Sequence, residues 1–156
     1  MITYFDSPIG LIELTATEKG IFSLYFKDER GEEESSKKLD KCKKQLDEYF
    51  ACKRKVFTVP LDYHGSEFQK KVWNELLKIP YGQVISYHEL ALRLGSEKLI
   101  RAAGGANARN PVSILIPCHR VIGSDGNLTS YGGGLWRKQW LLDHEGAAFQ
   151  QEMFLK

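Results

Sequence analysis

Cysteine is scarce in this sequence, and its few cysteines lie far apart. Cys42, Cys52 and Cys118 are the three in a chain of 156 residues, and they form no short-spaced pair. Disulfide frameworks and zinc knuckles both depend on closely spaced cysteines. We therefore expect no disulfide scaffold, no bound metal and no cofactor, and a reducing, cytoplasmic setting.

Long apolar runs are missing as well. No run approaches the roughly 20 residues that a helix needs to cross a bilayer. The N-terminus also lacks the basic start and the apolar core of a signal peptide. These absences predict a protein without membrane association, and the sequence contains no repeat or low-complexity tract.

A large excess of charge of one sign is also absent. The chain has 22 basic and 20 acidic residues, which gives a net charge of +2. The part up to Pro60 is neutral, so the small excess lies in the second part. Charge alone does not predict nucleic-acid binding here. Any contact with DNA would depend on few phosphate contacts and on DNA shape.

What is present indicates a two-domain α+β protein, with domains at 1–62 and 63–156. In the first, an amphipathic helix over about 37–50 follows from apolar residues at helical spacing. Short apolar runs bounded by turn residues predict strands at 2–5, 11–17, 21–26 and 56–59.

The second part is mainly helical. Ser66 and Ser86 each begin a capping-box pattern before an apolar helix, and Ser96 can cap a third helix over about 97–107. Two short helices joined by a turn that contains Gly95 indicate a helix-turn-helix unit, although many such pairs never contact DNA.

The third helix contains Arg101 followed by alanines and by the adjacent pair Gly104 and Gly105. Glycine costs a helix interior roughly 1 kcal/mol. Two accounts remain open. The glycines permit close packing inside the protein, or they leave a smooth face that lies against another backbone, with Arg101 projecting from it.

The segment from Ile114 to Gly123 contains the candidate nucleophile. Its apolar start predicts a buried strand or strand end. Cys118 adjoins His119 and Arg120, groups that favour a thiolate. A core cysteine beside a surface histidine is an equally weighted alternative. Neighbouring side chains on a strand point to opposite faces, so we expect an irregular chain or a bridging water here.

Two further features follow this segment. Tyr131 and the glycines at 132–134 form a loop that is either a linker or a close-fitting ligand site. A last helix begins at about Leu135 and ends with Glu145 at its C-terminus, where a carboxylate opposes the macrodipole. That penalty indicates another partner for Glu145, for which a histidine is a candidate.

Together these residues resemble the O6-alkylguanine-DNA alkyltransferases, also called methylated-DNA–protein-cysteine methyltransferases. The resemblance covers most of residues 68–146, and it is most specific at Asn110-Pro111 and at the Pro-Cys-His-Arg-Val run around Cys118. It implies a ribonuclease H-like N-terminal domain and a winged-helix-like C-terminal domain. The first part matches only in its layout of strands and a helix.

The resemblance also implies a reaction and its residues. Cys118 takes the alkyl group of O6-alkylguanine irreversibly and acts once, with O4-alkylthymine left open as a second substrate. His119 accepts the thiol proton through a water, Glu145 holds the imidazole, and Asn110 braces the turn. The residues implied for binding the purine are Tyr87, Val121, Tyr131, Gly132 and Gly133.

The implied partner is double-stranded DNA, bound by a monomer through the minor groove. Arg101 replaces the guanine that is flipped out of the helix, and the implied DNA contacts also include Ala102, Gly105 and Arg109. Some family members have Ser where Gly132 stands, so a side-chain contact is lost there.

Three alternative functions fit the sequence less well. Alkyltransferase-like proteins lack the nucleophile, and the cysteine at position 118 argues against them. A cysteine hydrolase would need an oxyanion hole and a substrate cleft, which no pattern marks. A DNA-binding regulator is disfavoured by the low net charge and by the absence of a dimerisation segment.

Overall fold

The computed structural model describes residues 1–126, 128 and 131–147. The chain divides into two compact units. The first contains Met1–His64 and Pro111–Leu115, and the second contains Gly65–Asn110 and the described residues from Ile116 onward. The sequence-based division at residue 62 did not anticipate that residues 111–115 group with the first unit. No described helix is long and apolar enough to cross a membrane.

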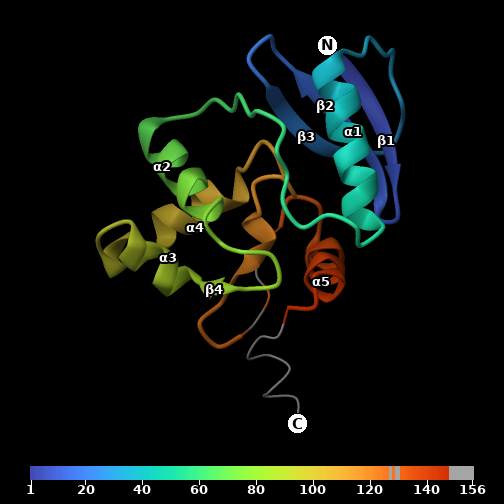
Figure 1. Cartoon of the computed structure of the whole chain (residues 1–156). Coiled ribbons are helices and arrows are strands. Elements are labelled where there is room, and N and C mark those ends of the chain that lie inside the picture. The colour runs from blue at the N-terminus through green and yellow to red at the C-terminus, as the bar shows by residue number, and fades with distance from the viewer. Residues whose placement is uncertain (127, 129–130, 148–156) are drawn as a thin grey trace. The chain divides into compact units, whose positions relative to one another are not determined.

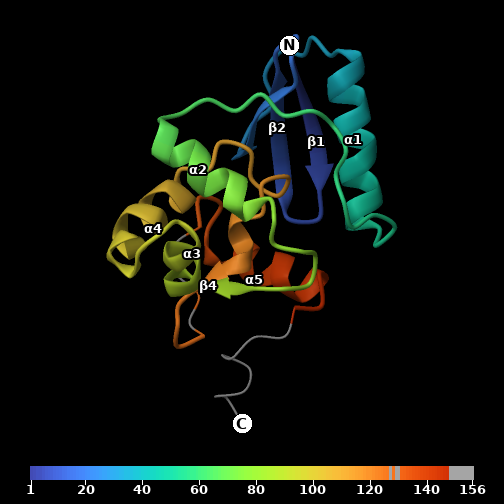
Figure 2. The ribbon, with the colours of Figure 1, turned by 60° about the vertical axis from the view of Figure 1, so that its left-hand side comes forward.

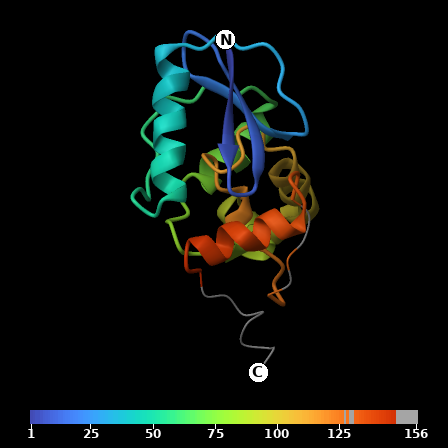
Figure 3. The same cartoon turned by 90° about the vertical axis from the view of Figure 1, so that its right-hand side faces the viewer.

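The first unit is an antiparallel sheet of three strands in the order β1-β2-β3, covered on one face by helix α1 (Figures 1 and 3). Alternate residues of β2, among them Ile12 and Leu14, are fully buried, and so are Leu39 and Leu46 on α1. The elements are β1 (Ile2–Ser7), β2 (Gly10–Ala16), β3 (Ile21–Lys27) and α1 (Lys37–Phe50).

The prediction of a strand at 56–59 is wrong, because the structure has no strand in this segment. Side chains bind its backbone instead of a neighbouring strand. Gln45 accepts a hydrogen bond from the Thr58 N–H, and Arg54 donates one to the Val56 carbonyl. Val56 is 68% exposed, so its β-branched side chain has no sheet core to join.

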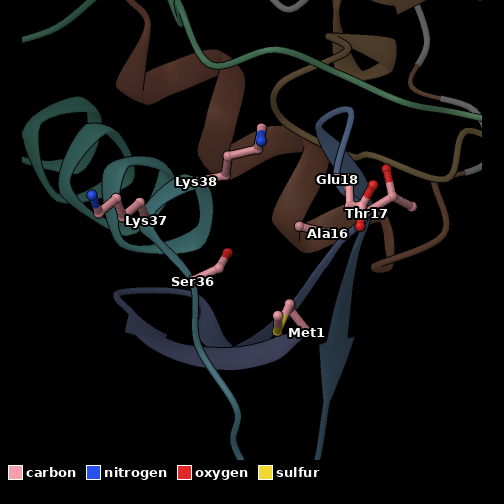
Figure 4. A pocket seen from close by; sticks show the side chains of 7 residues that line it. All are labelled: Met1, Ala16, Thr17, Glu18, Ser36, Lys37 and Lys38. Atoms are coloured by element: carbon pink, nitrogen blue, oxygen red, sulfur yellow. The ribbon is translucent and has the colours of Figure 1, made fainter.

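A surface hollow of about 450 Å³ lies at the N-terminal end of α1 (Figure 4). Lys37 and Lys38 line it together with Glu18, so both signs of charge are present. All of its lining residues belong to the first unit, and none of them is a predicted site residue.

The second unit is mainly helical, as expected. Helices α2, α3 and α4 pack against one another (Figure 2). The capping box at Ser66 is present, and the Ser86 hydroxyl accepts from the Glu89 N–H at the start of α3. The elements are α2 (Glu67–Leu76), β4 (Ile85–Ser86), α3 (Tyr87–Arg93), η1 (Glu97–Leu99), α4 (Ile100–Ala108), η2 (Cys118–Arg120), β5 (Val121–Ile122) and α5 (Leu135–His144).

Two local expectations need correction. The third helix over 97–107 is a 3-10 turn, η1, followed by the separate helix α4. The expected strand before Cys118 is absent: Ile114 has a φ of 74°, a left-handed conformation that interrupts a strand. Cys118 itself begins the 3-10 turn η2, so the chain is irregular there, as strand alternation had indicated.

Candidate active site

Cys118 is a buried thiol on the 3-10 turn η2, with 4% of its surface exposed. Two buried amides hold the backbone around it. Asn110 Nδ2 donates to the Ile116 carbonyl at 2.7 Å, and Asn107 Nδ2 donates to the Cys118 carbonyl at 3.3 Å. Asn110 was predicted as a brace for this turn, whereas no sequence pattern singled out Asn107.

His119 forms a buried pair with Glu145. The His119 Nε2 atom lies 2.8 Å from Glu145 Oε2, and neither side chain is exposed. Glu145 also accepts from Arg120, and a carboxylate in such a pair accepts hydrogen bonds only, so the imidazole proton belongs on Nε2. Nδ1 is then the basic nitrogen, and it has no hydrogen-bond partner among the described residues.

The same carboxylate binds the next residue in a forked arrangement. Arg120 Nε lies 2.8 Å from Glu145 Oε1, and Arg120 Nη2 lies 2.9 Å from Oε2. Arg120 Nη1 donates to the Ile79 carbonyl at the end of the α2 segment. These bonds fix the position of η2 relative to both α2 and α5. Glu145 and Ile79 were not predicted from the sequence as the partners of Arg120.

The two titratable groups of the pair shift in the same direction for different reasons. Burial lowers the pKa of His119, and the attraction of Glu145 offsets only part of this effect. Burial raises the pKa of Glu145, but hydrogen bonds and charges from His119 and Arg120 outweigh it and hold that pKa well below its usual range. At neutral pH the pair is therefore a neutral imidazole beside a carboxylate.

A buried lysine lies on the same helix face as Glu145. Lys138, Leu141, Leu142 and Glu145 follow the spacing i, i+3, i+4, i+7 and are all buried. Burial lowers the pKa of Lys138 to about 8, while the charge of Cys118 opposes the shift. Its Nζ atom has no hydrogen-bond partner among the described residues. The i, i+3, i+4, i+7 spacing could have revealed this lysine from the sequence.

Tyr87 joins the site from the start of α3. Its hydroxyl accepts from Asn107 Nδ2 at 3.4 Å, and its ring centroid lies 5.7 Å from Lys138 Nζ. The amide of Asn107 thus connects Tyr87 to the Cys118 backbone. Trp73 is buried, and its indole donates to the Ala106 carbonyl.

The other predicted purine-binding residues lie on two segments. Val121 is buried and begins β5, which pairs with β4 directly after η2. In the 131–134 turn, the Gly134 N–H donates to the Tyr131 carbonyl, and Gly132 is exposed whereas Gly133 is buried. These contacts fix the shape of the turn, and its role in binding the purine stays a prediction.

The predicted DNA contacts all lie on α4 or at its end. Arg101, Gly105 and Arg109 recur at intervals of four residues along one stripe, and Ala102 is also exposed. A Cβ atom added at Gly105 would have no atom within 4 Å, and one added at Gly104 would make ordinary contact with the Tyr87 ring. Packing within the described residues therefore does not require glycine at either position.

The structure thus connects Tyr87 to the Cys118 backbone through Asn107, pairs His119 with Glu145, and attaches Asn110 to the Ile116 carbonyl two residues before Cys118. The α4 stripe is a second, separate group of predicted residues. Among residues 1–126, 128 and 131–147, no three His, Cys, Asp or Glu side chains come together as a metal site.

Comparison with known proteins identifies the family of this arrangement. Residues 1–63 match the ribonuclease-like domain of 6-O-methylguanine DNA methyltransferase, and residues 67–147 match its DNA binding domain. A methylated-DNA--protein-cysteine methyltransferase of Methanosarcina acetivorans is 44% identical over 92% of this chain and 96% of its own. Its counterpart in Mycolicibacterium paratuberculosis is 45% identical over 91% of each chain.

Solved structures agree with the sequence comparison. The crystal structure of Mycobacterium tuberculosis OGT in complex with DNA superposes with a TM-score of 0.84, at 40% identity over 92% of each chain. The fold class, with an antiparallel N-terminal unit and a mainly helical second unit, is confirmed. Because both domain models match and the relatives align over nearly their whole length, the chain belongs to the 6-O-methylguanine DNA methyltransferase family.

Proposed function

We propose that this protein repairs O6-alkylguanine in DNA by transferring the alkyl group to its own Cys118. Membership of the family supports this proposal, and so does the likeness to the mycobacterial OGT that was crystallised with DNA. The observation that supports it most directly is the buried pair of His119 and Glu145, which leaves His119 Nδ1 as an acceptor in the residue next to a buried thiol.

The reaction is a displacement at the alkyl carbon. The Cys118 sulfur forms a bond to that carbon while the bond from the carbon to guanine O6 breaks. The thiol proton passes through a water to His119 Nδ1, and the charge of Glu145 stabilises the imidazolium. The electron pair of the broken bond stays on the purine beside the Tyr87 hydroxyl, and the proton that His119 holds passes through water to the purine. The guanine that remains in the DNA is unmodified.

The product explains why the protein acts once. A thioether is a poor leaving group, so the alkyl group stays on sulfur. The protein is then consumed in equal amount with the lesion. O4-alkylthymine is accepted only if the same pocket admits a pyrimidine.

The α4 stripe is the proposed DNA surface. The missing side chain at Gly105 lets the helix approach a DNA backbone closely in the minor groove. Arg101 is exposed on this face and takes the place of the extruded guanine. Arg109, at the other end of the stripe, contacts phosphate. We propose that one monomer with domains 1–62 and 63–156 suffices, and that it acts in the cytoplasm.

Intact-mass spectrometry tests the proposal. The protein is mixed with a duplex that contains one O6-methylguanine, and with the same duplex that contains guanine. We expect one added methyl group on Cys118, at equal stoichiometry, with the lesion duplex only. Cys52→Ser, a change at an exposed thiol, should react like the wild type, whereas Cys118→Ser should not react. Turnover beyond one methyl per chain would contradict the mechanism.

A further inference from the structure

A turn of three consecutive glycines needs something to hold it, and α5 supplies a candidate. The carbonyl of Gly133 accepts a hydrogen bond from Arg137 Nη1 at 2.8 Å. The N–H of the same peptide unit, which belongs to Gly134, donates to the Tyr131 carbonyl at 2.8 Å. Because the C=O and N–H of a trans peptide point in opposite directions, this peptide plane is held from both sides.

Trp136 covers the guanidinium that makes this bond. The Arg137 Cζ atom lies 4.5 Å from the centroid of the Trp136 ring. A Cβ atom added at Gly134 would lie 3.4 Å from Cδ1 of the same ring, so the indole also adjoins the last glycine of the turn. A cation over an indole face is stabilised by about 0.5–1 kcal/mol at exposed sites. This contact gives a role to a tryptophan that is 57% exposed.

The position of Arg137 in the helix is electrostatically unfavourable. Gly134 is the N-cap of α5 and offers no side-chain cap, and Arg137 lies in the first turn that follows. The N-terminal end of a helix disfavours cations because the macrodipole is positive there. Arg137 nevertheless occupies this position. We infer that its hydrogen bond to the Gly133 carbonyl offsets the electrostatic cost.

We propose that Arg137, supported by Trp136, is a positioning residue that fixes the 131–134 turn in the shape that binds the purine. This inference rests on the proposed function, since it assigns Gly132 and Gly133 to the purine edge. Glycine has the largest backbone freedom of all residues, so three in succession leave the turn with many shapes. Arg137 removes that freedom through one charged hydrogen bond, without touching the substrate itself.

Two reactions of Cys118 separate this role from a general structural one. Free O6-benzylguanine needs the purine site and the thiol, whereas iodoacetamide needs only the thiol. We expect Arg137→Ala to slow benzyl transfer by about ten-fold or more, the value of a hydrogen bond to a charged group. Alkylation of Cys118 by iodoacetamide, followed by peptide mass, should stay near the wild-type rate.

Further variants test the two contacts separately. Arg137→Lys keeps the charge but loses the planar fork, so it should recover only part of the benzyl-transfer rate. Trp136→Ala should slow benzyl transfer by about two- to five-fold through the lost cation–π contact, and Trp136→Phe should stay closer to the wild type. Arg93→Ala is the matched control, because it removes an exposed arginine that pairs with Glu89 on α3.

Hydrogen exchange measures how well the 131–134 turn is held, independently of any reaction at Cys118. Arg137→Ala should speed exchange at the Gly134 amide by about ten-fold and leave exchange around Cys118 unchanged. Benzyl transfer at the wild-type rate in Arg137→Ala, or an equal loss of both reactions, would overturn the positioning role. A wild-type protein that reacts with iodoacetamide but takes no methyl group from the O6-methylguanine duplex would instead overturn the proposed function, and exchange at Gly134 would still decide the inference.

Discussion

His119 Nε2 and Glu145 Oε2 lie 2.8 Å apart, and neither side chain has exposed surface. Arg120 occupies both oxygens of the same carboxylate. A single buried anion therefore orients the proposed base and neutralises a buried guanidinium. Its role in folding and its role in the reaction can be measured separately.

Glu145→Gln keeps the shape of the side chain and removes its charge. Arg120 then stays buried without a counter-charge, which should lower the free energy of unfolding by about 3–5 kcal/mol. Loss of the oriented base should also slow methyl transfer by about 100-fold or more. Urea denaturation and single-turnover kinetics measure the two effects.

A matched control exists in the first unit. Glu48 pairs with Arg54 at 3.1 Å, and both side chains are partly exposed. Glu48→Gln should cost less than about 1 kcal/mol, the usual value for exposed pairs. Equal losses of stability in the two variants would refute the idea that burial gives the Glu145 pair its importance.

The stability of the protein should fall in mild acid. Burial lowers the pKa of His119, so below about pH 6.5 the unfolded chain binds more protons than the folded one, and protons favour unfolding. The depressed pKa of Glu145 adds a further loss below about pH 4.5. Urea midpoints between pH 8 and pH 5 should decrease in the wild type and decrease less in His119→Gln. A wild-type midpoint that is constant over this range would contradict the expectation.

Much of the fold could be predicted because it depends on local pattern. The helix 37–50 has the predicted bounds, since its apolar residues repeat at helical spacing and Ser36 caps it. The strand expected at 56–59 had the same kind of local signal. It failed because strand formation needs a partner, and the Gln45 side chain binds this backbone instead.

Site residues could be predicted where the residue type itself indicates the chemistry. They were missed where the role of a residue depends on packing between distant parts of the chain. Residue type made Cys118, His119 and Glu145 candidates, and the family resemblance implied their roles. The expected pairing of Glu145 with a histidine is present in the structure. Lys138 follows Arg137 and looks like part of a solvated charged pair. The spacing with Leu141, Leu142 and Glu145 places it on the buried face of α5, but how completely it is buried depends on how α5 packs against η2.

Gly105→Ala should separate stability from DNA binding. A Cβ atom at this position meets open space, so alanine should raise the free energy of unfolding by about 1 kcal/mol through its helix propensity. If α4 lies against DNA, the methyl group should weaken duplex binding by about ten-fold, or 1.4 kcal/mol. Fluorescence anisotropy with a lesion duplex measures binding, and transfer from free O6-benzylguanine should be unchanged. If this variant binds the duplex with wild-type affinity, α4 does not lie against DNA.

Lys138→Met tests whether the buried lysine lowers the stability of the protein and increases the reactivity of Cys118. In the wild type the pKa of Lys138 falls to about 8, so the folded protein charges this group at a cost at pH 7. Methionine fills a similar volume without charge and should raise the free energy of unfolding at pH 7 by about 1–3 kcal/mol.

The contribution of Lys138 to the free energy of unfolding depends on pH. Between about pH 8 and pH 10.5 the unfolded chain holds a proton on Lys138 that the folded protein releases, so wild-type stability gains from this group as pH rises. The advantage of Lys138→Met should therefore shrink between pH 7 and pH 10. Because the Lys138 charge attracts the Cys118 sulfur as an anion, the same variant should react with iodoacetamide several-fold more slowly at pH 7. If the variant matches the wild type both in stability at pH 7 and in Cys118 reactivity, Lys138 is uncharged in the folded protein at that pH.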